Sequence, residues 1–324
     1  MPTPNLSLIV PVYNEEETLP LLIEAILAAL EPLPYTWEVV LVDDGSEDSS
    51  LQVMTQLAEE YSEHLHVVSF RRNFGQTAAI AAGLDYAKGE IIILLDADLQ
   101  NDPADIPMLL EKLDEGYDLV SGWRKQRQDT YLTRTLPSNL ANWLISRVTG
   151  VPLHDYGCTL KAYRREVLEG FRLYGEMHRF IPVFAHSVGA KITEVPVNHH
   201  PRRFGKAKYG LERTLKVVLD LFTVKFLVSY SSKPIYLFGG AGLVLISVSS
   251  AMLLFLGVRR ILISTSVLLS PIFPLAIMLL IMGFQSLLMG LIAELLVRTY
   301  YESQRKPIYL IHKTINLPEP ISEE

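Results

Sequence analysis

Short apolar runs alternate with amphipathic segments along residues 1–122. The runs are typical of buried strands, and the segments between them repeat apolar residues every three or four positions, as helices do. The expected strands are Leu6–Val12, Glu38–Val42, Leu65–Phe70, Ile91–Leu95 and Leu119–Ser121, and the expected helices are Glu15–Leu30, Ser49–Tyr61, Gln76–Ala87 and Ala104–Glu115. This alternation predicts an α/β domain with a doubly wound, mostly parallel sheet. Asn14, which precedes a run of glutamates, is expected to cap the first helix.

Two long apolar stretches follow in the last third of the chain. Pro234–Leu256 carries no charged residue, and Ile261–Leu296 carries only Glu294. Because about 20 apolar residues cross a bilayer as a helix, both are predicted to be transmembrane helices, with buried core helices as the alternative. Arg259 and Arg260 are expected in the loop between them.

Most basic residues near this helix pair lie on its outer sides. They are Lys216, Lys225 and Lys233 before the first stretch, and Arg298, Arg305, Lys306 and Lys313 after the second. The positive-inside tendency therefore places both ends of the pair, and the N-terminal domain, in the cytosol. We expect an integral two-span protein of a bacterial inner membrane.

The segment just before the first span is basic and amphipathic. Its apolar residues at helical spacing are Leu211, Leu215, Val218, Phe222 and Phe226. They predict a helix in the membrane interface, or alternatively a helix packed on the soluble domain, and the basic residues favour anionic head groups. The predicted organisation is a catalytic domain (1–210), this juxtamembrane helix (211–233), two spans (234–297) and a cytosolic tail (298–324).

Composition fits a soluble domain joined to a membrane segment. Of the 324 residues, 49% are hydrophobic and 20% are charged, and the net charge is −7. Such a chain is too apolar for a disordered protein and too charged for one embedded entirely in lipid. Cys158, the single cysteine, excludes an internal disulfide and is interpreted as a small buried residue. The N-terminal residues show no pattern of a cleavable signal peptide.

Polar residues follow the expected strands, where α/β sheets bind ligands. Asp43 and Asp44 follow one strand, and Asp96 and Asp98 follow another. A divalent cation is the natural way to relieve repulsion among such carboxylates. Asp96 and Asp98, two apart in an extended run, are expected to point to the same side with Gln100, as ligands of Mg²⁺ or Mn²⁺. The glycine motifs of dinucleotide enzymes and P-loop NTPases are absent.

An ordered set of motifs runs through residues 5–210. The motifs are Val10-Pro11-Val12-Tyr13-Asn14-Glu15, Val42-Asp43-Asp44-Gly45-Ser46, Arg72-Asn73-Phe74-Gly75-Gln76, Asp96-Ala97-Asp98-Leu99-Gln100, Asp155-Tyr156-Gly157-Cys158 and Arg202-Arg203-Phe204-Gly205-Lys206-Ala207-Lys208-Tyr209. In these motifs the sequence resembles family 2 glycosyltransferases of the GT-A fold, especially polyprenyl-phosphate glycosyltransferases similar to dolichol-phosphate mannosyltransferase and bactoprenol glucosyltransferase.

The resemblance implies a role for each matching position. Nucleotide-sugar binding is implied for Pro11, Tyr13, Glu15, Asp43, Asp44 and Asp96, and we add Arg124 and Arg127 as candidates. Asp96, Asp98 and Gln100 match the metal and diphosphate site, Asp155 matches a carboxylate beside the acceptor, and the basic loop Arg202, Arg203, Lys206 and Lys208 would hold phosphates. Ala207 stands where the family usually has serine, which removes one phosphate hydrogen bond.

Several of these residues also have a purely structural interpretation. Tyr13 could close the core at a strand end, and Asp44 could belong to an ordinary turn. Arg124 and Arg127 could be solvated, and Asp155 could cap a turn. Whether Asp155 serves as a base or positions the nucleophile is open.

The resemblance implies metal-dependent, inverting transfer of a sugar to a polyprenyl (undecaprenyl-like) phosphate, for glycosylation of the cell envelope. UDP-glucose is the favoured donor, and GDP-mannose is an alternative. The other hypotheses are a catalytically inactive nucleotide-binding membrane scaffold, a nucleotidyltransferase and a processive polysaccharide synthase, whose Gln-x-x-Arg-Trp motif is missing. Small residues at Gly239-Gly240-Ala241-Gly242 and from Gly283 to Gly290 suggest a homo-oligomer. We expect no nucleic-acid partner.

Overall fold

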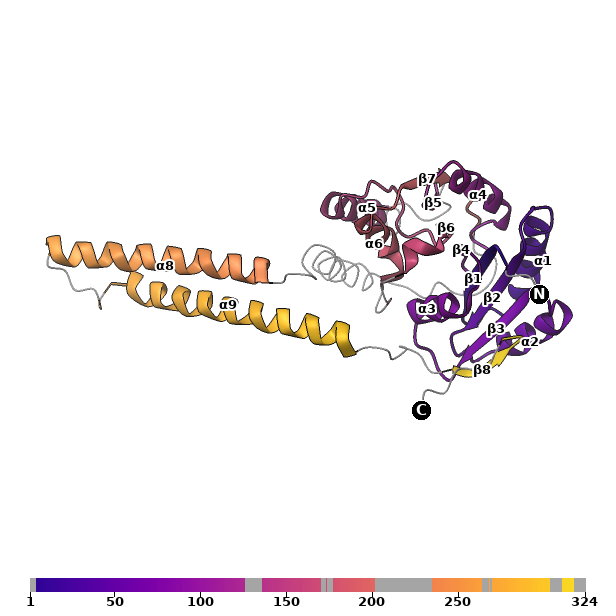
Figure 1. The fold of residues 1–324 in the computed structure, drawn as a ribbon, viewed down its shortest axis with the longest axis horizontal. Helices are drawn as coiled ribbons and strands as arrows, with labels where there is room; N and C mark the ends of the chain where they lie inside the picture. The colour runs from indigo at the N-terminus through magenta and orange to yellow at the C-terminus, as the bar shows by residue number, and fades with distance from the viewer. Residues whose placement is uncertain are drawn as a thin grey trace. The chain divides into compact units, whose positions relative to one another are not determined.

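The computed structural model describes residues 4–125, 136–169, 173, 177–201, 235–263, 268, 270–303 and 311–317. The chain divides into two compact units: residues 1–224 with 307–324, and residues 225–306. The first unit is an α/β domain and the second is a helix pair (Figure 1).

An eight-stranded mixed sheet forms the centre of the first unit. Its strands are β1 (Leu6–Val12), β2 (Trp37–Asp43), β3 (Leu65–Phe70), β4 (Ile91–Leu94), β5 (Leu119–Trp123), β6 (Lys161–Arg164), β7 (Ile192–Pro196) and β8 (Ile311–Ile315), in the order β7-β5-β6-β4-β1-β2-β3-β8. Strands β1 to β4 are parallel, as is the pair β5–β7, whereas β6 and β8 run antiparallel to their neighbours. The predicted α/β class and parallel centre are confirmed.

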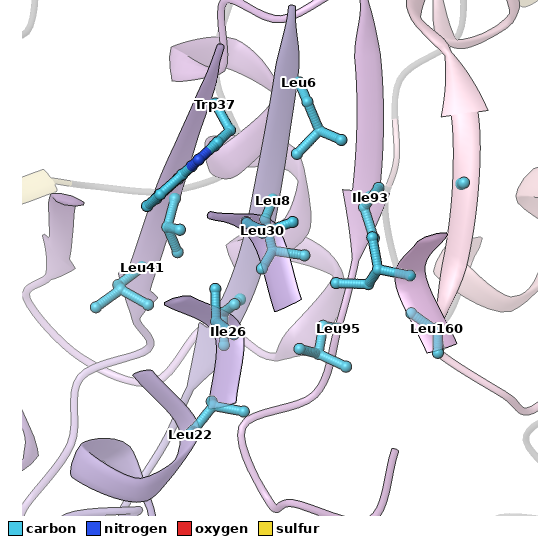
Figure 2. Packing of buried hydrophobic residues seen from close by; sticks show 14 of the residues in the cluster. Leu6, Leu8, Leu22, Ile26, Leu30, Trp37, Leu41, Ile93, Leu95 and Leu160 are labelled. Atoms are coloured by element: carbon cyan, nitrogen blue, oxygen red, sulfur yellow. The ribbon is translucent and has the colours of Figure 1, made fainter. Parts of the chain in front are cut away.

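Helices cover both faces of this sheet. They are α1 (Leu19–Leu30), α2 (Ser50–Glu60), α3 (Gln76–Tyr86), α4 (Ile106–Asp114), α5 (Leu136–Thr149) and α6 (Ile181–Ser187), with short 3-10 helices η1 (Pro103–Asp105), η3 (Arg165–Leu168) and η4 (Met177–Phe180). The core on one face combines alternate strand residues such as Leu8 and Ile93 with Leu22 and Ile26 of α1 (Figure 2). Helix α3 contacts β1 and β2, where Gly83 lets it approach Ile9, because an added Cβ would lie 2.3 Å from Ile9 Cγ2.

The first helix starts later than its sequence pattern predicted. Helix α1 begins at Leu19, next to Thr18 in the N-cap position and Pro20. Asn14 is not its cap, because its backbone is left-handed, with φ 53°, and its Oδ1 instead accepts a hydrogen bond from Glu47 N at 2.8 Å. The residues from Asn14 to Thr18 thus form a turn that ties β1 to the loop after β2.

The last described strand, β8, lies within the segment predicted as a tail. It pairs antiparallel with β3, so that Val67 is opposite Ile315, and it covers an edge of the sheet. Asn316 holds the end of this strand by donating from Nδ2 to Ala58 O at 2.8 Å and to Leu65 O at 2.9 Å. The sheet therefore contains residues from both sides of the helix pair in the sequence.

The second unit consists of two long apolar helices, α8 (Ile235–Ile263) and α9 (Ile272–Ser303). Phe238–Leu262 and Ile272–Ala293 are long and apolar enough to cross a membrane. The helices pack closely where Gly242 meets Gly283, because an added Cβ at Gly242 would lie 2.7 Å from Gly283 O. Ser286 Oγ also donates to Phe238 O at 2.8 Å. These two glycines therefore allow α8 and α9 of the same chain to pack closely.

Arg259 and Arg260 do not lie in the loop between the helices, contrary to the sequence-based prediction. Both belong to the last two turns of α8, which continues to Ile263. Basic side chains near a helix C-terminus interact favourably with the partial negative charge of its free carbonyl groups. Helical structure therefore extends past the charged pair.

Candidate functional site

The site residues gather where the parallel strands β1 to β4 end. Chain connections at this edge carry Pro11 to Glu15, Asp43 and Asp44, residues 71–76, and Asp96 to Gln100. Because the carboxyl ends of parallel strands share one edge, residues distant in sequence meet here. Tyr13 and Glu15 are half-buried in the turn after β1, and Glu15 Oε2 accepts a hydrogen bond from Thr18 Oγ1 at 3.1 Å.

Asp43 ends β2 and Asp44 follows it. Both carboxylates are held by hydrogen bonds. Asp43 accepts from Ser46 N at 2.9 Å and from Ser69 Oγ at 2.8 Å. Asp44 Oδ1 accepts from Phe74 N at 2.7 Å, and Asp44 Oδ2 accepts from Gly75 N at 3.0 Å. Burial raises the pKa of Asp44 to about 6, although these amide bonds lower it. These bonds hold both carboxylates against the loops around the end of β2.

The loop after β2 is locked against the loop after β3. Gly45 has φ 67°, and an added Cβ would lie 2.3 Å from the backbone carbon of Arg72. No larger side chain fits that approach without moving one of the two loops. This contact holds the loops after β2 and β3 together at the edge of the sheet.

The pair after β4 is arranged differently. Asp96 is half-buried and accepts from Gln76 Nε2 and from Thr159 Oγ1, both at 2.7 Å. Burial and the negative charge of Asp98 raise the pKa of Asp96, while Thr159 and the charges of Arg124 and Lys161 oppose that rise. The carboxyl groups of Asp96 and Asp98 therefore influence each other's ionisation.

Asp96 and Asp98 come together through a turn, not through strand alternation as predicted. Strand β4 ends at Leu94, and Leu99 has a left-handed backbone with φ 56°. Gln100 closes the turn by donating its backbone N–H to Asp98 Oδ1 at 3.1 Å.

These residues fit a divalent cation bound together with a substrate. In the described residues no three His, Cys, Asp or Glu side chains are grouped as a complete metal site. Mg²⁺ and Mn²⁺ are commonly held by one or two carboxylates plus phosphate oxygens and water. Asp96 and Asp98 supply the two carboxylates, so a donor diphosphate would complete the coordination.

Asp155 and Arg124, which are far apart in the sequence, form a buried ion pair. Arg124 Nε donates to Asp155 Oδ2 at 2.7 Å, and Arg124 Nη2 donates to Asp155 Oδ1 at 2.9 Å. Burial opposes the charge of Arg124, but the carboxylate beside it raises the pKa of Arg124 above its usual value. Arg124 is therefore not solvated, and Asp155 does more than cap a turn. Within the described residues Arg124 Nη1 has no hydrogen-bond partner, so its N–H groups are available to an anion.

The pattern missed three residues of this site. Gln76 ends the motif Arg72-Asn73-Phe74-Gly75-Gln76, but the sequence predicts no role for it, and it predicts none for Thr159 or Lys161. The contacts of Gln76 and Thr159 with Asp96 span 20 and 63 positions, so no local pattern could have identified them. Cys158 is buried, as predicted, and burial raises the pKa of its thiol.

The remaining candidates lie outside the described residues. They are Arg127, Arg202, Arg203, Lys206 and Lys208. The juxtamembrane helix predicted for 211–233 lies outside them as well.

Comparison with known proteins identifies relatives of the whole chain. Residues 7–171 match the model of Glycosyl transferase family 2. The chain is 42% identical over 311 residues to a dodecaprenyl-phosphate galacturonate synthase of Rhizobium johnstonii, covering 95% of this chain and 92% of the relative. It is 38% identical over 326 residues to an undecaprenyl-phosphate 4-deoxy-4-formamido-L-arabinose transferase of Salmonella enteritidis, covering 100% of this chain and 98% of that one.

A solved structure has the same fold as the first unit. It is glucosyl-3-phosphoglycerate synthase from Mycobacterium tuberculosis, in complex with Mn²⁺, uridine diphosphate and phosphoglyceric acid. The TM-score is 0.50 at 21% identity, and the match covers 68% of this chain and 78% of that chain. The likeness supports the predicted GT-A architecture.

Proposed function

Because the chain belongs to Glycosyl transferase family 2, we propose that it transfers a sugar from a nucleotide sugar to the phosphate of a polyprenyl lipid. The main support is that the carboxylates of Asp96 and Asp98 and the Arg124–Asp155 ion pair lie at the same edge of the sheet. Thr159, which donates to Asp96, belongs to the same loop as Asp155. The first pair suits a metal-bound diphosphate, and the second suits an anionic acceptor. Full-length similarity to two polyprenyl-phosphate sugar transferases supports the acceptor class.

On the donor side, the loops after β1 and β2 would hold the nucleotide, and Asp96 and Asp98 would hold the diphosphate end. Asp96 and Asp98 would hold a Mg²⁺ or Mn²⁺ ion, which would supply positive charge to stabilise the departing nucleoside diphosphate. Gln76 and Thr159 orient Asp96 through both of its oxygens. That arrangement fixes the position of the leaving group before the acceptor arrives.

On the acceptor side, Asp155 acts by holding Arg124. Both carboxylate oxygens already accept N–H bonds from one guanidinium, which makes Asp155 a poor proton acceptor. A base is not required, because the second pKa of a phosphate is near 6 and the acceptor is largely dianionic at neutral pH. Arg124 Nη1 would bind that phosphate and direct it at the anomeric carbon. Direct displacement inverts the configuration of that carbon.

The identity of the sugar is a narrower question. UDP-glucose was the sequence-based expectation, but the names of both full-length relatives point to other sugars, galacturonate and 4-deoxy-4-formamido-L-arabinose. We therefore place UDP-linked forms of these two sugars ahead of UDP-glucose and GDP-mannose as donors to be tested.

The experiment is transfer of a labelled sugar from each donor to undecaprenyl phosphate by detergent-purified protein, with and without Mg²⁺ or Mn²⁺. We expect one donor to give a labelled lipid and a free nucleoside diphosphate, and we expect the Asp98→Ala variant to give neither. Release of inorganic diphosphate instead would indicate a nucleotidyltransferase. Nucleotide binding without product from any donor would indicate a scaffold.

The fold also supports the proposed membrane topology. Strand β8 follows α9 in the sequence but pairs with β3, so residues before and after the helix pair belong to one folded sheet. If α8 and α9 each cross the membrane once, both ends return to the same side, as this pairing requires. The basic residues that flank the pair support the cytosol as that side.

Cysteine labelling in intact cells tests this topology, because the native Cys158 is buried. A cysteine replacing Leu268, which is exposed in the connection between α8 and α9, should react with a membrane-impermeant maleimide. A cysteine replacing Ser187 in the first unit should react only after the cells are lysed. The reverse pattern would overturn the cytosolic assignment.

A further inference from the structure

A buried lysine lies beside the site without a role in the mechanism above. Lys161 is the first residue of β6, paired with Leu94 of β4 on one side and Ser121 of β5 on the other. It is 3% exposed, and burial lowers the pKa of its amine. An ammonium group deep in a domain costs free energy unless its surroundings compensate for the lost water.

Backbone carbonyl groups supply the partners of this amine. Lys161 Nζ donates to Cys158 O, and to Tyr156 O at 3.3 Å. Within the described residues it forms no ion pair. Its hydrogen bonds thus go to the connection that leads into β6, not to another side chain.

That connection, residues 155–159, carries one contact of each half of the site. Asp155 at its start binds Arg124, which would hold the acceptor. Thr159 at its end binds Asp96, which would hold the donor's diphosphate. The two carbonyl groups held by Lys161 lie between these residues, so the ammonium constrains the distance between the two halves.

We propose that Lys161 is a positioning residue that aligns the acceptor half of the site with the donor half by holding the backbone of residues 155–159. The inference rests on the proposed sugar transfer. It assigns to Lys161 no contact with either substrate. Loss of the ammonium should therefore impair the alignment needed for transfer more than it impairs binding of the donor.

The chain offers a matched control at the other end of the same strand. Arg165 follows β6 directly and also donates to two backbone carbonyl groups, Gly89 O and Ala87 O, both at 2.7 Å. Those carbonyl groups belong to the connection between α3 and β4, away from the edge that carries the site. Arg165→Met removes the same kind of contact without touching the site loops.

The test compares K161M, K161R and R165M with the wild-type enzyme in the labelled-sugar assay. We expect K161M to lower kcat by about 100-fold, the size of effect that a misplacement of about 1 Å produces. The affinity for UDP with Mn²⁺, measured by calorimetry, should change less than about threefold. K161R keeps the charge and the N–H donors and should recover at least about tenfold of the lost kcat. R165M should lower Tm while leaving kcat within about twofold.

Other results would refute the proposed positioning role of Lys161. If K161M lowers Tm like R165M but keeps wild-type kcat, Lys161 is only structural and the proposal fails. A parallel loss of UDP affinity and kcat would also overturn it. Should K161M not fold, K161Q replaces it in a double-mutant cycle with T159V: coupled losses of kcat support action through this loop, and additive losses refute it. Absence of product from the wild-type enzyme with every donor would instead refute the proposed function.

Discussion

The ends of β2 and β4 each carry two aspartates, yet the two pairs are satisfied in different ways. After β2, both carboxylates accept backbone N–H groups, and Asp43 also accepts the Ser69 hydroxyl. After β4, Asp96 is held by the side chains of two residues that are distant in the sequence, Gln76 and Thr159. The two ends therefore differ in what holds the carboxylates, although burial and a neighbouring aspartate raise the pKa of one carboxyl group at both ends.

The largest effect should come from removing one carboxylate of the β4 pair. Asp98→Asn should lower kcat/KM by about 1,000-fold, because a metal ion contributes several kcal/mol of transition-state stabilisation. It should also raise the Mn²⁺ concentration needed for half-maximal rate. Asp44→Asn is the control at the β2 end, and its Mn²⁺ requirement should equal that of the wild type. An equal shift in both variants would contradict the distinction between the two pairs.

The ion pair at β5 extends the comparison to the acceptor side. Asp155→Asn should lower kcat by about 100-fold, because Arg124 loses the partner that orients it. The loss should be similar at about pH 8 and about pH 5.5 if Asp155 positions Arg124. A rate profile at the two pH values, measured with saturating donor, decides this. Nearly full activity at the higher pH with loss at the lower one would restore Asp155 as a base.

The sequence pattern predicted the parallel centre of the fold well but not its flanks. The bounds of β1 and β3 agree with the expected strands because each is a short, mostly apolar run. Strands β6 and β8 are short, contain charged residues and pair antiparallel with strands that are distant in the sequence. Such pairing leaves no local signal, because the hydrophobic periodicity and the composition of a segment depend only on residues that are close in the sequence.

The same limit separates the predicted from the missed parts of the site. Asp43, Asp44, Asp96 and Asp98 follow apolar strands, so position alone indicated the edge where they meet. The partners of these residues were not visible, because Thr159 reaches Asp96 across 63 positions and Arg124 reaches Asp155 across 31. The hydrogen bonds that hold each of these carboxylates therefore came only from the structure.

Glycine substitution can test how firmly the β2 loop is locked. Gly45→Ala should destabilise the protein by about 3–4 kcal/mol, because the new Cβ would lie 2.3 Å from the backbone of Arg72 and φ is positive. Gly150 also has a positive φ, but its Cβ would meet nothing within 4 Å. Gly150→Ala should therefore cost only about 1–2 kcal/mol. Urea unfolding measures both, and equal losses would show that the loops separate easily.

The pH dependence of stability gives the smallest and most specific test of the β2 pair. The folded pKa of Asp44, about 6, exceeds the pKa of about 3.9 that an aspartate has in an unfolded chain, so the native state binds this proton more tightly than the unfolded state. Its contribution to stability is complete below about pH 4 and is lost as the pH rises through about 6. We expect the unfolding free energy of the wild type to fall by about 2 kcal/mol over that window, relative to Asp44→Asn. Parallel pH profiles for the two proteins would show instead that the amides of Phe74 and Gly75 compensate fully for the burial of Asp44.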